Sequence, residues 1–138
     1  VNENFEYCLV QVTLDGQKNL IIGKDLIDQT LERIGVKEHL ILATCKGSDL
    51  KGANAKHPYL ERASIIITGD HVTAEAGTGI VHTAPGHGLE DYAVAKENDL
   101  EVLSPVKANG VFQEDVEYLA GMFVEYVGFF CLVRCGLV

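Results

Sequence analysis

The chain has 138 residues, of which 47% are hydrophobic, and it carries a formal net charge of −9. That length suffices for one hydrophobic core and is short for two, so we expect residues 1–138 to form a single domain. Only 11 basic residues oppose 20 acidic ones. This composition argues against a chain that holds nucleic acid unaided, because Lys and Arg contacts to phosphates supply most non-specific affinity.

The first third of the chain predicts a β-hairpin followed by a helix and a third strand. The turn pair Asp15-Gly16 separates two runs of β-prone residues, which is typical of a hairpin. Apolar residues then recur at helical spacing, and Gly35 stands where a C-terminal helix cap belongs. We expect strands at residues 5–12, 19–22 and 39–45 and a helix at residues 24–34.

The middle of the chain predicts a loop and a buried strand. Small and polar residues at 52–58, ending in a proline, indicate a surface loop. Residues 64–68 contain three successive isoleucines, which a strand buried on both faces explains better than an alternating strand. Further on, the pair Asn109-Gly110 favours a second hairpin turn.

The cysteines indicate reduced thiols. Their spacings contain no C-x-x-C metal motif, and no secretory signal precedes them. We therefore expect free thiols in a cytosolic protein. The cysteines are Cys8, Cys45, Cys131 and Cys135.

The most distinctive stretch is GTGIVHTAPGHGLEDY at residues 77–92. Its first half, residues 78–83, can form a short buried strand, and its second half a glycine-rich turn that leads into an amphipathic helix. A strand end and a helix start joined by a tight turn would bring His82, His87 and Asp91 into one neighbourhood. This layout predicts a functional site.

Three other interpretations compete for this stretch. A dinucleotide-binding fingerprint is rejected, because His82 occupies the place of the third glycine that G-x-G-x-x-G needs. A metal site is a minor alternative: His82, His87 and Asp91 are ligand types, but they do not form the one-face pair of a zinc helix. A structural interpretation also stays open, in which Glu90 and Asp91 offset the positive end of the helix and His82 is a core histidine.

The sequence HTAPGHGLEDY at residues 82–92 resembles the editing domain of isoleucyl-tRNA synthetases. GDHVTAEAGTG before it, LEVLSPV at residues 100–106 and the turn GVF at residues 110–112 extend the resemblance over roughly residues 1–124. The related valyl and leucyl enzymes share the GTG strand and an acidic residue at the position of Asp91, but they lack HTAPGHG. The isoleucyl family is therefore favoured.

The resemblance implies an α+β fold, with a mixed, curved, barrel-like β-sheet and flanking helices, as in the editing domains of valyl-, isoleucyl- and leucyl-tRNA synthetases. The flanking helices would be residues 24–34 and 89–97, and the strand–helix–strand run at 78–103 leaves room for a parallel strand pair. Residues 125–138 depart from the family as a divergent apolar tail. This tail is too short, and too interrupted by charges and glycine, to span a bilayer.

The resemblance also implies hydrolysis of valine mischarged onto the isoleucine tRNA. An aminoacylation site that accepts isoleucine cannot exclude valine, because the missing methylene is worth only about 1–3 kcal/mol, a limit for which isoleucyl-tRNA synthetases are a standard example. A second, smaller site would cleave the valyl ester with a positioned water. The implied partners are the 3′ end of the mischarged tRNA and the remainder of the synthetase chain. No cofactor, metal or membrane is implied, and the expected location is cytoplasmic.

Within the motif, the resemblance assigns Asp91 and His82 to the catalytic site. Asp91 would anchor the α-ammonium group of the substrate, a role that suits a carboxylate whose charged form the helix N-terminus stabilises by about 0.3–1 kcal/mol. His82 would be the gate that blocks a longer amino acid. The substrate-binding wall would be Thr83, Ala84, Pro85, Gly86, His87 and Gly88. The alternative is a non-catalytic remnant that docks the tRNA acceptor end or supports the parent enzyme, since the family's threonine-rich strand would precede Val1.

Overall fold

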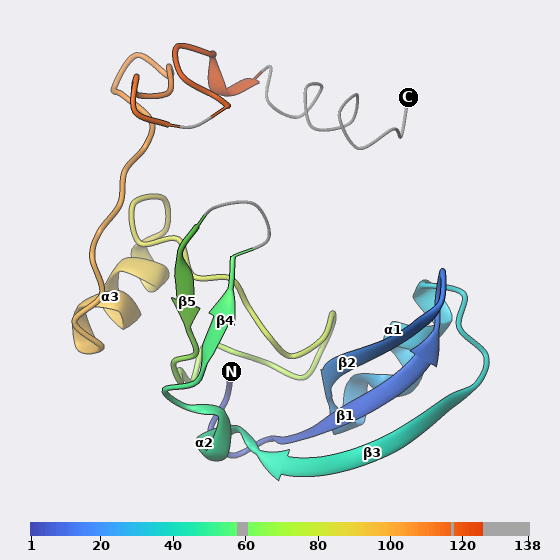
Figure 1. Cartoon of the computed structure of the whole chain (residues 1–138). Helices are drawn as coiled ribbons and strands as arrows, with labels where there is room; N and C mark the ends of the chain where they lie inside the picture. The colour runs from blue at the N-terminus through green and yellow to red at the C-terminus, as the bar shows by residue number, and fades with distance from the viewer. Residues whose placement is uncertain (58–60, 117, 126–138) are drawn as a thin grey trace. The chain divides into compact units, whose positions relative to one another are not determined.

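The computed structural model describes residues 1–57, 61–116 and 118–125 (Figure 1). The chain divides into two compact units, a first unit at Val1–His82 and a second unit that begins at Thr83. The described part has an α+β composition, as predicted, with two antiparallel sheets and three α-helices. The single-domain expectation stays a prediction.

The first unit is built on a three-stranded antiparallel sheet with the strand order β2-β1-β3. Its strands are β1 at Glu6–Thr13, β2 at Gln17–Gly23 and β3 at His39–Lys46, close to the predicted ranges. Asp15 and Gly16 lie in the hairpin turn with φ values of 48° and 102°, a left-handed backbone that Asp tolerates and Gly adopts freely. The predicted hairpin is confirmed.

A short 3₁₀ turn and a helix cover one side of β1 and β2. The 3₁₀ turn η1 is Lys24–Leu26 and helix α1 is Ile27–Arg33, so the predicted helix is confirmed except that its first turn is 3₁₀. Gly35 ends the helix as predicted, with φ 73° and an N–H that donates to the Glu32 carbonyl at 3.0 Å. Burying a Val, Leu or Ile side chain contributes about 1.5–3 kcal/mol, so the apolar cluster holds the helix on the sheet. The cluster consists of Cys8, Val10, Val12, Ile22, Leu26, Ile27 and Leu31.

A second, two-stranded sheet corrects two predictions for the middle of the chain. Strand β4 is Asn54–Lys56, and it pairs antiparallel with β5 at Ala63–Ile65. The predicted surface loop at 52–58 is therefore wrong in part, because its backbone pairs with the next strand. The predicted strand at 64–68 is shorter than expected, and it is not buried on both faces, since Ile65 is 47% exposed.

The predicted strand at 78–83 is wrong. These residues form a loop, because Gly77 and Gly79 have φ values of 73° and 72°, which lie outside the strand region. Ile80 and Val81 are 39% and 48% exposed rather than buried. The parallel pair for which the run at 78–103 left room is not formed, since every strand ladder in the described part of the chain is antiparallel. The predicted barrel-like sheet is wrong as well, because these strands close no barrel.

Two hydrogen bonds hold this loop against β2 and α1. The Gly23 N–H donates to the Thr78 carbonyl at 2.8 Å, and the Thr30 hydroxyl donates to the Gly77 carbonyl at 2.6 Å. The glycine loop is therefore anchored by the sheet and the helix that precede it in the sequence.

Tyr7 links the same loop to the start of the chain through a buried hydroxyl. The side chain is 0% exposed, and its hydroxyl accepts from the Asn2 N–H at 2.9 Å and donates to the Gly79 carbonyl at 2.7 Å. Burial raises the pKa of Tyr7, and the hydrogen bond from the Asn2 amide offsets only part of this rise. The single-turn helix α2, Gly47–Leu50, also approaches this region so closely that a Cβ at Gly47 would meet the Asn2 carbonyl.

The second unit contains helix α3 at Leu89–Glu97, the range predicted for it. The prediction that this helix is amphipathic is wrong, because its apolar residues form no buried stripe: Ala95 is its one buried residue, and Leu89 is 91% exposed. The predicted turn at Asn109-Gly110 is confirmed by the bond from the Lys107 N–H to the Val111 carbonyl at 2.8 Å. Isolated bridges rather than full strands flank that turn. Local signals in the sequence thus located both features correctly.

Three further expectations concern thiols, the tail and the membrane. Cys8 and Cys45 are free, as predicted, and the other two cysteines lie outside the described residues. The tail expected at 125–138 also lies outside them from residue 126 onward. Of the helices that the structure describes, none has the length and apolar character needed to cross a membrane.

Replacing Tyr7 with phenylalanine should destabilise the first unit, because the Asn2 N–H and the Gly79 carbonyl lose their buried partner. Leaving a buried polar group unpaired costs about 1–3 kcal/mol, so the free energy of unfolding measured by urea titration should fall by at least about 1 kcal/mol. Tyr92→Phe is the matched control, since Tyr92 is 45% exposed. Equal effects of the two substitutions would contradict the role given to Tyr7.

Candidate functional site

The predicted substrate-binding wall forms a tight turn in front of α3. Pro85 and Gly86 occupy the centre of the turn, and the His87 N–H closes it by donating to the Ala84 carbonyl at 2.9 Å. Packing requires glycine at position 86, because a Cβ there would meet the Leu103 carbonyl. The turn is thus fixed by its own hydrogen bond and by the chain that lies against it.

Asp91 ties the first helical turn of α3 to this loop. Its Oδ2 accepts a hydrogen bond from the Ala84 N–H at 3.1 Å, and the residue is partly buried. Gly88 leaves room for the carboxylate, since a Cβ at that position would lie 3.0 Å from Oδ2. Among the residues that the structure describes, Oδ1 of Asp91 has no hydrogen-bond partner. One oxygen therefore fixes the loop, and the other has no hydrogen-bond partner within the described chain.

The remaining predicted site residues are distributed over both units. His82 is exposed at the end of the first unit, whereas His87 is exposed on the turn of the second unit. Thr83 is partly buried where the second unit begins. The structure brings Asp91 together with the 84–88 turn, and the expected proximity of His82 to Asp91 stays a prediction.

His57, to which the sequence assigned no chemistry, is a buried histidine in the neighbourhood of His82. It is 8% exposed, and its backbone N–H donates to the Arg62 carbonyl at 3.0 Å. Burial lowers the pKa of His57, and the nearby positive charges of Arg62 and His82 lower it further. His57 and His82 are far apart in the sequence, so no spacing pattern could have linked them.

Neither the surface pockets nor the potential metal-binding side chains that the structure describes indicate another site around residues 82–92. Two hollows of about 480 and 460 Å³ open on the first unit, and both include His39 in their lining. None of residues 83–91 lines either hollow. Within residues 1–57, 61–116 and 118–125, no three His, Cys, Asp or Glu side chains gather as metal ligands, so the metal-site alternative gains no geometric support.

Comparison with known proteins identifies relatives that match about nine-tenths of the chain. No protein-family model matches the chain. It is 47% identical over 125 residues to the isoleucine–tRNA ligase of Colwellia psychrerythraea, a match that covers 90% of this chain. The ligases of Shewanella halifaxensis and Moorella thermoacetica are 45% and 44% identical over 125 residues, with 90% and 91% of this chain covered.

The chain is a relative of isoleucine–tRNA ligases. The family resemblance drawn from the HTAPGHGLEDY motif is therefore confirmed. This chain spans 13% of the length of the ligases that it matches. Relationship to these ligases places it among aminoacyl-tRNA synthetases and the proteins of translation, and the function of this particular segment is a separate question.

In this ligase-related chain, residues 83–91 contain two carboxylates, Glu90 and Asp91, and few nucleophiles. Thr83 is the one hydroxyl side chain among residues 83–91, and that stretch contains no cysteine or serine. A carboxylate oxygen held at a fixed place can bind an ammonium or guanidinium group through a charge-assisted hydrogen bond. The arrangement of Asp91 therefore suits the binding of a cationic group.

His57 should make the first unit less stable in acid. Its pKa in the folded chain lies below the ordinary value of 6.5, so the unfolded chain binds a proton more readily. The stabilising contribution should therefore be complete above about pH 6.5 and decrease as the pH falls below that value. Urea titrations at about pH 7.5 and about pH 5.5 should show this decrease in the wild type and a smaller one in His57→Gln.

Arg62→Gln serves as an intermediate variant, because it removes one positive charge and keeps the buried ring. Its pH dependence should lie between those of the wild type and His57→Gln. An unchanged acid dependence in His57→Gln would show that other groups cause it.

Proposed function

We propose that this chain is the segment of an isoleucine–tRNA ligase that hydrolyses valine mischarged onto the isoleucine tRNA. Relationship to isoleucine–tRNA ligases and the resemblance of residues 82–92 to their editing domain support the proposal. The observation that carries it is the geometry of Asp91, whose carboxylate is fixed through one oxygen and has no partner for the other among the described residues.

Asp91 would hold the α-ammonium group of the aminoacyl ester. The ammonium is a small cation, and an ionised carboxylate at the N-terminal turn of a helix has its negative charge stabilised by the helix dipole. The bond from the Ala84 N–H to Oδ2 restricts the rotation of the carboxylate before substrate arrives. Such preorganisation lowers the entropic cost of holding the ester in register with a water molecule.

The reaction itself would be hydrolysis of an ester by water. The oxygen of water forms a bond to the carbonyl carbon, the bond from that carbon to the ribose oxygen breaks, and a proton of water ends on the ribose hydroxyl. Valine and the free tRNA are the products. The chain would supply position and charge, since no cysteine or serine lies in the motif and this step requires no covalent intermediate.

His82 would exclude the correctly charged amino acid by its size. Isoleucine and valine differ by one methylene, which is worth about 1–3 kcal/mol in a binding pocket, so a smaller second site is needed to reject isoleucine sterically. His82 is exposed, and its neighbour His57 is buried. The lowered pKa of His57 favours the neutral form of that ring beside His82 near neutral pH.

A non-catalytic role in docking the tRNA acceptor end or supporting the ligase is the second candidate. It is favoured by the same hydrogen bond, because the Oδ2 contact to Ala84 already gives Asp91 a structural task. The two candidates differ in what Oδ1 does. Variants of Asp91 that keep the structural contact but remove the charge can therefore separate them.

Asp91→Asn should abolish most of the clearance of mischarged valine in a complete ligase that carries this segment. The asparagine oxygen can still accept from the Ala84 N–H, so the fold should be retained, but the charge that binds the ammonium is lost. Losing a charged partner of this kind costs about 2–5 kcal/mol, so the deacylation rate should fall by at least about 30-fold. The measurement is hydrolysis of valine-charged isoleucine tRNA, with isoleucine activation as the test of an intact enzyme.

Glu90→Gln is the matched control, since it removes a charge of the same sign from the same helical turn at an exposed position. Asp91→Ala should lose both deacylation and the contact to Ala84. If Asp91→Asn clears valine at the wild-type rate and only Asp91→Ala is impaired, the carboxylate is structural and the non-catalytic candidate is favoured.

His82→Ala should admit isoleucine to the site. The smaller side chain leaves room for the extra methylene, so hydrolysis of correctly charged isoleucine tRNA should rise by about tenfold or more. Clearance of mischarged valine in the same variant is the internal control, because valine fits both pockets. Isoleucine-charged tRNA that stays as stable as with the wild type would remove His82 from the gate.

A further inference from the structure

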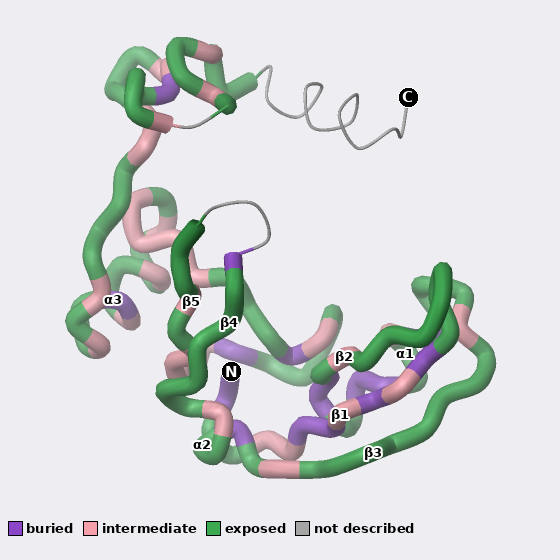
Figure 2. The backbone as a smooth tube through the Cα atoms, viewed as in Figure 1, coloured by how far each residue is buried: buried purple, intermediate pink, exposed green. Residues whose placement is uncertain are grey.

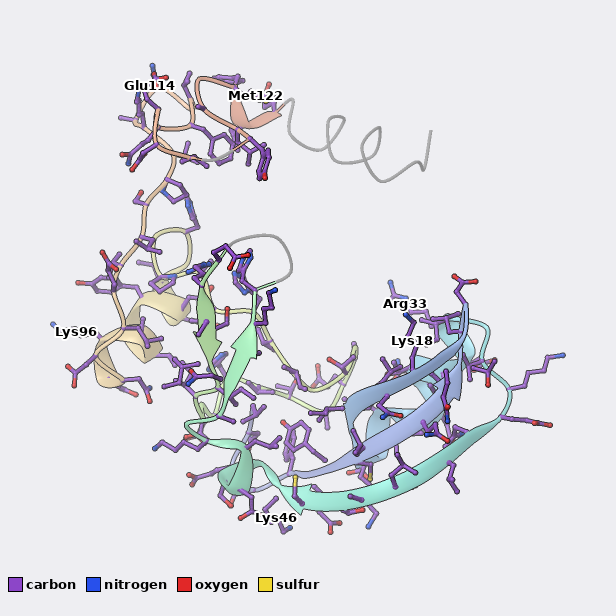
Figure 3. The ribbon with its side chains drawn as sticks, viewed as in Figure 1. Lys18, Arg33, Lys46, Lys96, Glu114 and Met122 are labelled. Carbon is purple, nitrogen blue, oxygen red and sulfur yellow. The ribbon has the colours of Figure 1, made fainter. Side chains whose placement is uncertain are left out.

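The hydroxyl of Thr30 joins helix α1 to the glycine loop that precedes His82. Thr30 lies in the last turn of α1, which ends at Arg33 (Figure 3), and its hydroxyl donates to the Gly77 carbonyl at 2.6 Å. A Thr hydroxyl within a helix can instead bond to a carbonyl one turn earlier in the same helix. Here the partner is 47 positions away in the sequence. The bond is therefore a contact between two separate segments of the first unit.

Three consecutive carbonyls of the glycine loop are held by three different elements. The Gly77 carbonyl, held by α1, is the first of them. The Thr78 carbonyl accepts from the Gly23 N–H at the end of β2, and the Gly79 carbonyl accepts from the buried Tyr7 hydroxyl on β1. Figure 2 shows β1 as buried over most of its length, so the strand that carries Tyr7 is a firm support. Together the three bonds fix where the loop runs.

Hydrogen bonds rather than side-chain packing determine the path from the loop to His82. Ile80 and Val81 are 39% and 48% exposed, so their burial contributes little. The Thr78 hydroxyl accepts from the Ile80 N–H at 3.3 Å, which extends the fixed backbone by one residue. Val81 alone then separates this backbone from His82. The position of His82 thus depends on the bonds made at residues 77–80.

The bond from Thr30 is the one that can be removed without unfolding the sheet. Residues 73–77 are all exposed, so Gly77 is the point at which an exposed segment meets its first anchor. Tyr7 is fully buried and also binds Asn2, so its loss should affect the whole unit. The Thr30 hydroxyl has one partner among the described residues, and that bond is exposed to solvent. Its loss should therefore loosen the loop and leave the core intact.

We propose that Thr30 is a positioning residue for the His82 gate, because its hold on the Gly77 carbonyl keeps His82 where it excludes isoleucine. This inference rests on the proposed function, since it assigns Thr30 a part in the selectivity of the same site. Isoleucine and valine differ by one methylene, so exclusion by size requires a gate that does not move aside. A loop with one anchor fewer would let His82 retreat and admit the longer side chain. Valine fits in either case.

Thr30→Val tests the proposal, because it removes the hydroxyl and keeps the branched shape and a similar helix propensity. In a complete ligase that carries this segment, hydrolysis of isoleucine-charged tRNA should rise about three- to tenfold relative to that of valine-charged tRNA, the factor that corresponds to one net hydrogen bond. The amides of residues 77–82 should also exchange faster with solvent. Thr30→Ser keeps the hydroxyl and should restore the wild-type values. Thr13→Val is the matched control, since Thr13 is exposed at the end of β1.

A double variant separates positioning from a general structural effect. In His82→Ala the gate is already open, so the addition of Thr30→Val should not raise isoleucine hydrolysis further. An effect of the same size in both backgrounds, or unchanged selectivity or unchanged exchange at residues 77–82 in Thr30→Val alone, would overturn the inference and leave the proposed function standing. A wild-type ligase that clears no mischarged valine would contradict the proposed function, and this inference with it.

Discussion

The buried hydroxyl of Tyr7 is the contact on which the first unit depends. It accepts from the Asn2 N–H and donates to the Gly79 carbonyl, and so it joins the start of the chain, the central strand and the loop that leads to His82. Because burial raises the pKa of this phenol, it remains a donor to Gly79 across the physiological pH range. No apolar side chain of similar size could serve both partners.

Tyr7 influences the chain before His82 by fixing the backbone of the glycine loop. With the Gly79 carbonyl held by Tyr7 and the Thr78 carbonyl held by the Gly23 N–H, the loop has little freedom to shift. Glycine at position 79 is favoured by its positive φ, and a Cβ there would lie 3.3 Å from the Leu26 side chain, which would have to shift. The GTG sequence is therefore explained by backbone conformation and close packing. Its role is structural, because it fixes the loop that leads to the residues that follow.

Sequence reasoning succeeded where the determining forces are local. The Asp15-Gly16 hairpin follows from turn chemistry, and helix α3 follows from the glycine-rich turn before it and the acidic residues of its first turn, so neighbouring residues suffice to predict them. It failed for residues 78–83, where an apolar run favoured a strand but two left-handed glycines and tertiary hydrogen bonds imposed a loop. The contact from Ala84 to Asp91 was missed because it depends on how the turn folds back on the helix.

The hydrogen bond of Tyr7 in the first unit and that of Asp91 in the second unit join residues at very different sequence separations. Tyr7 and Gly79 are 72 positions apart, whereas the bond that fixes Asp91 to Ala84 spans 7 positions. Closing a long loop costs more entropy than closing a short one, and contacts of short range form faster during folding. The turn and helix that carry Asp91 are therefore favoured to fold first. The GTG loop reaches its final conformation only after the sheet has formed.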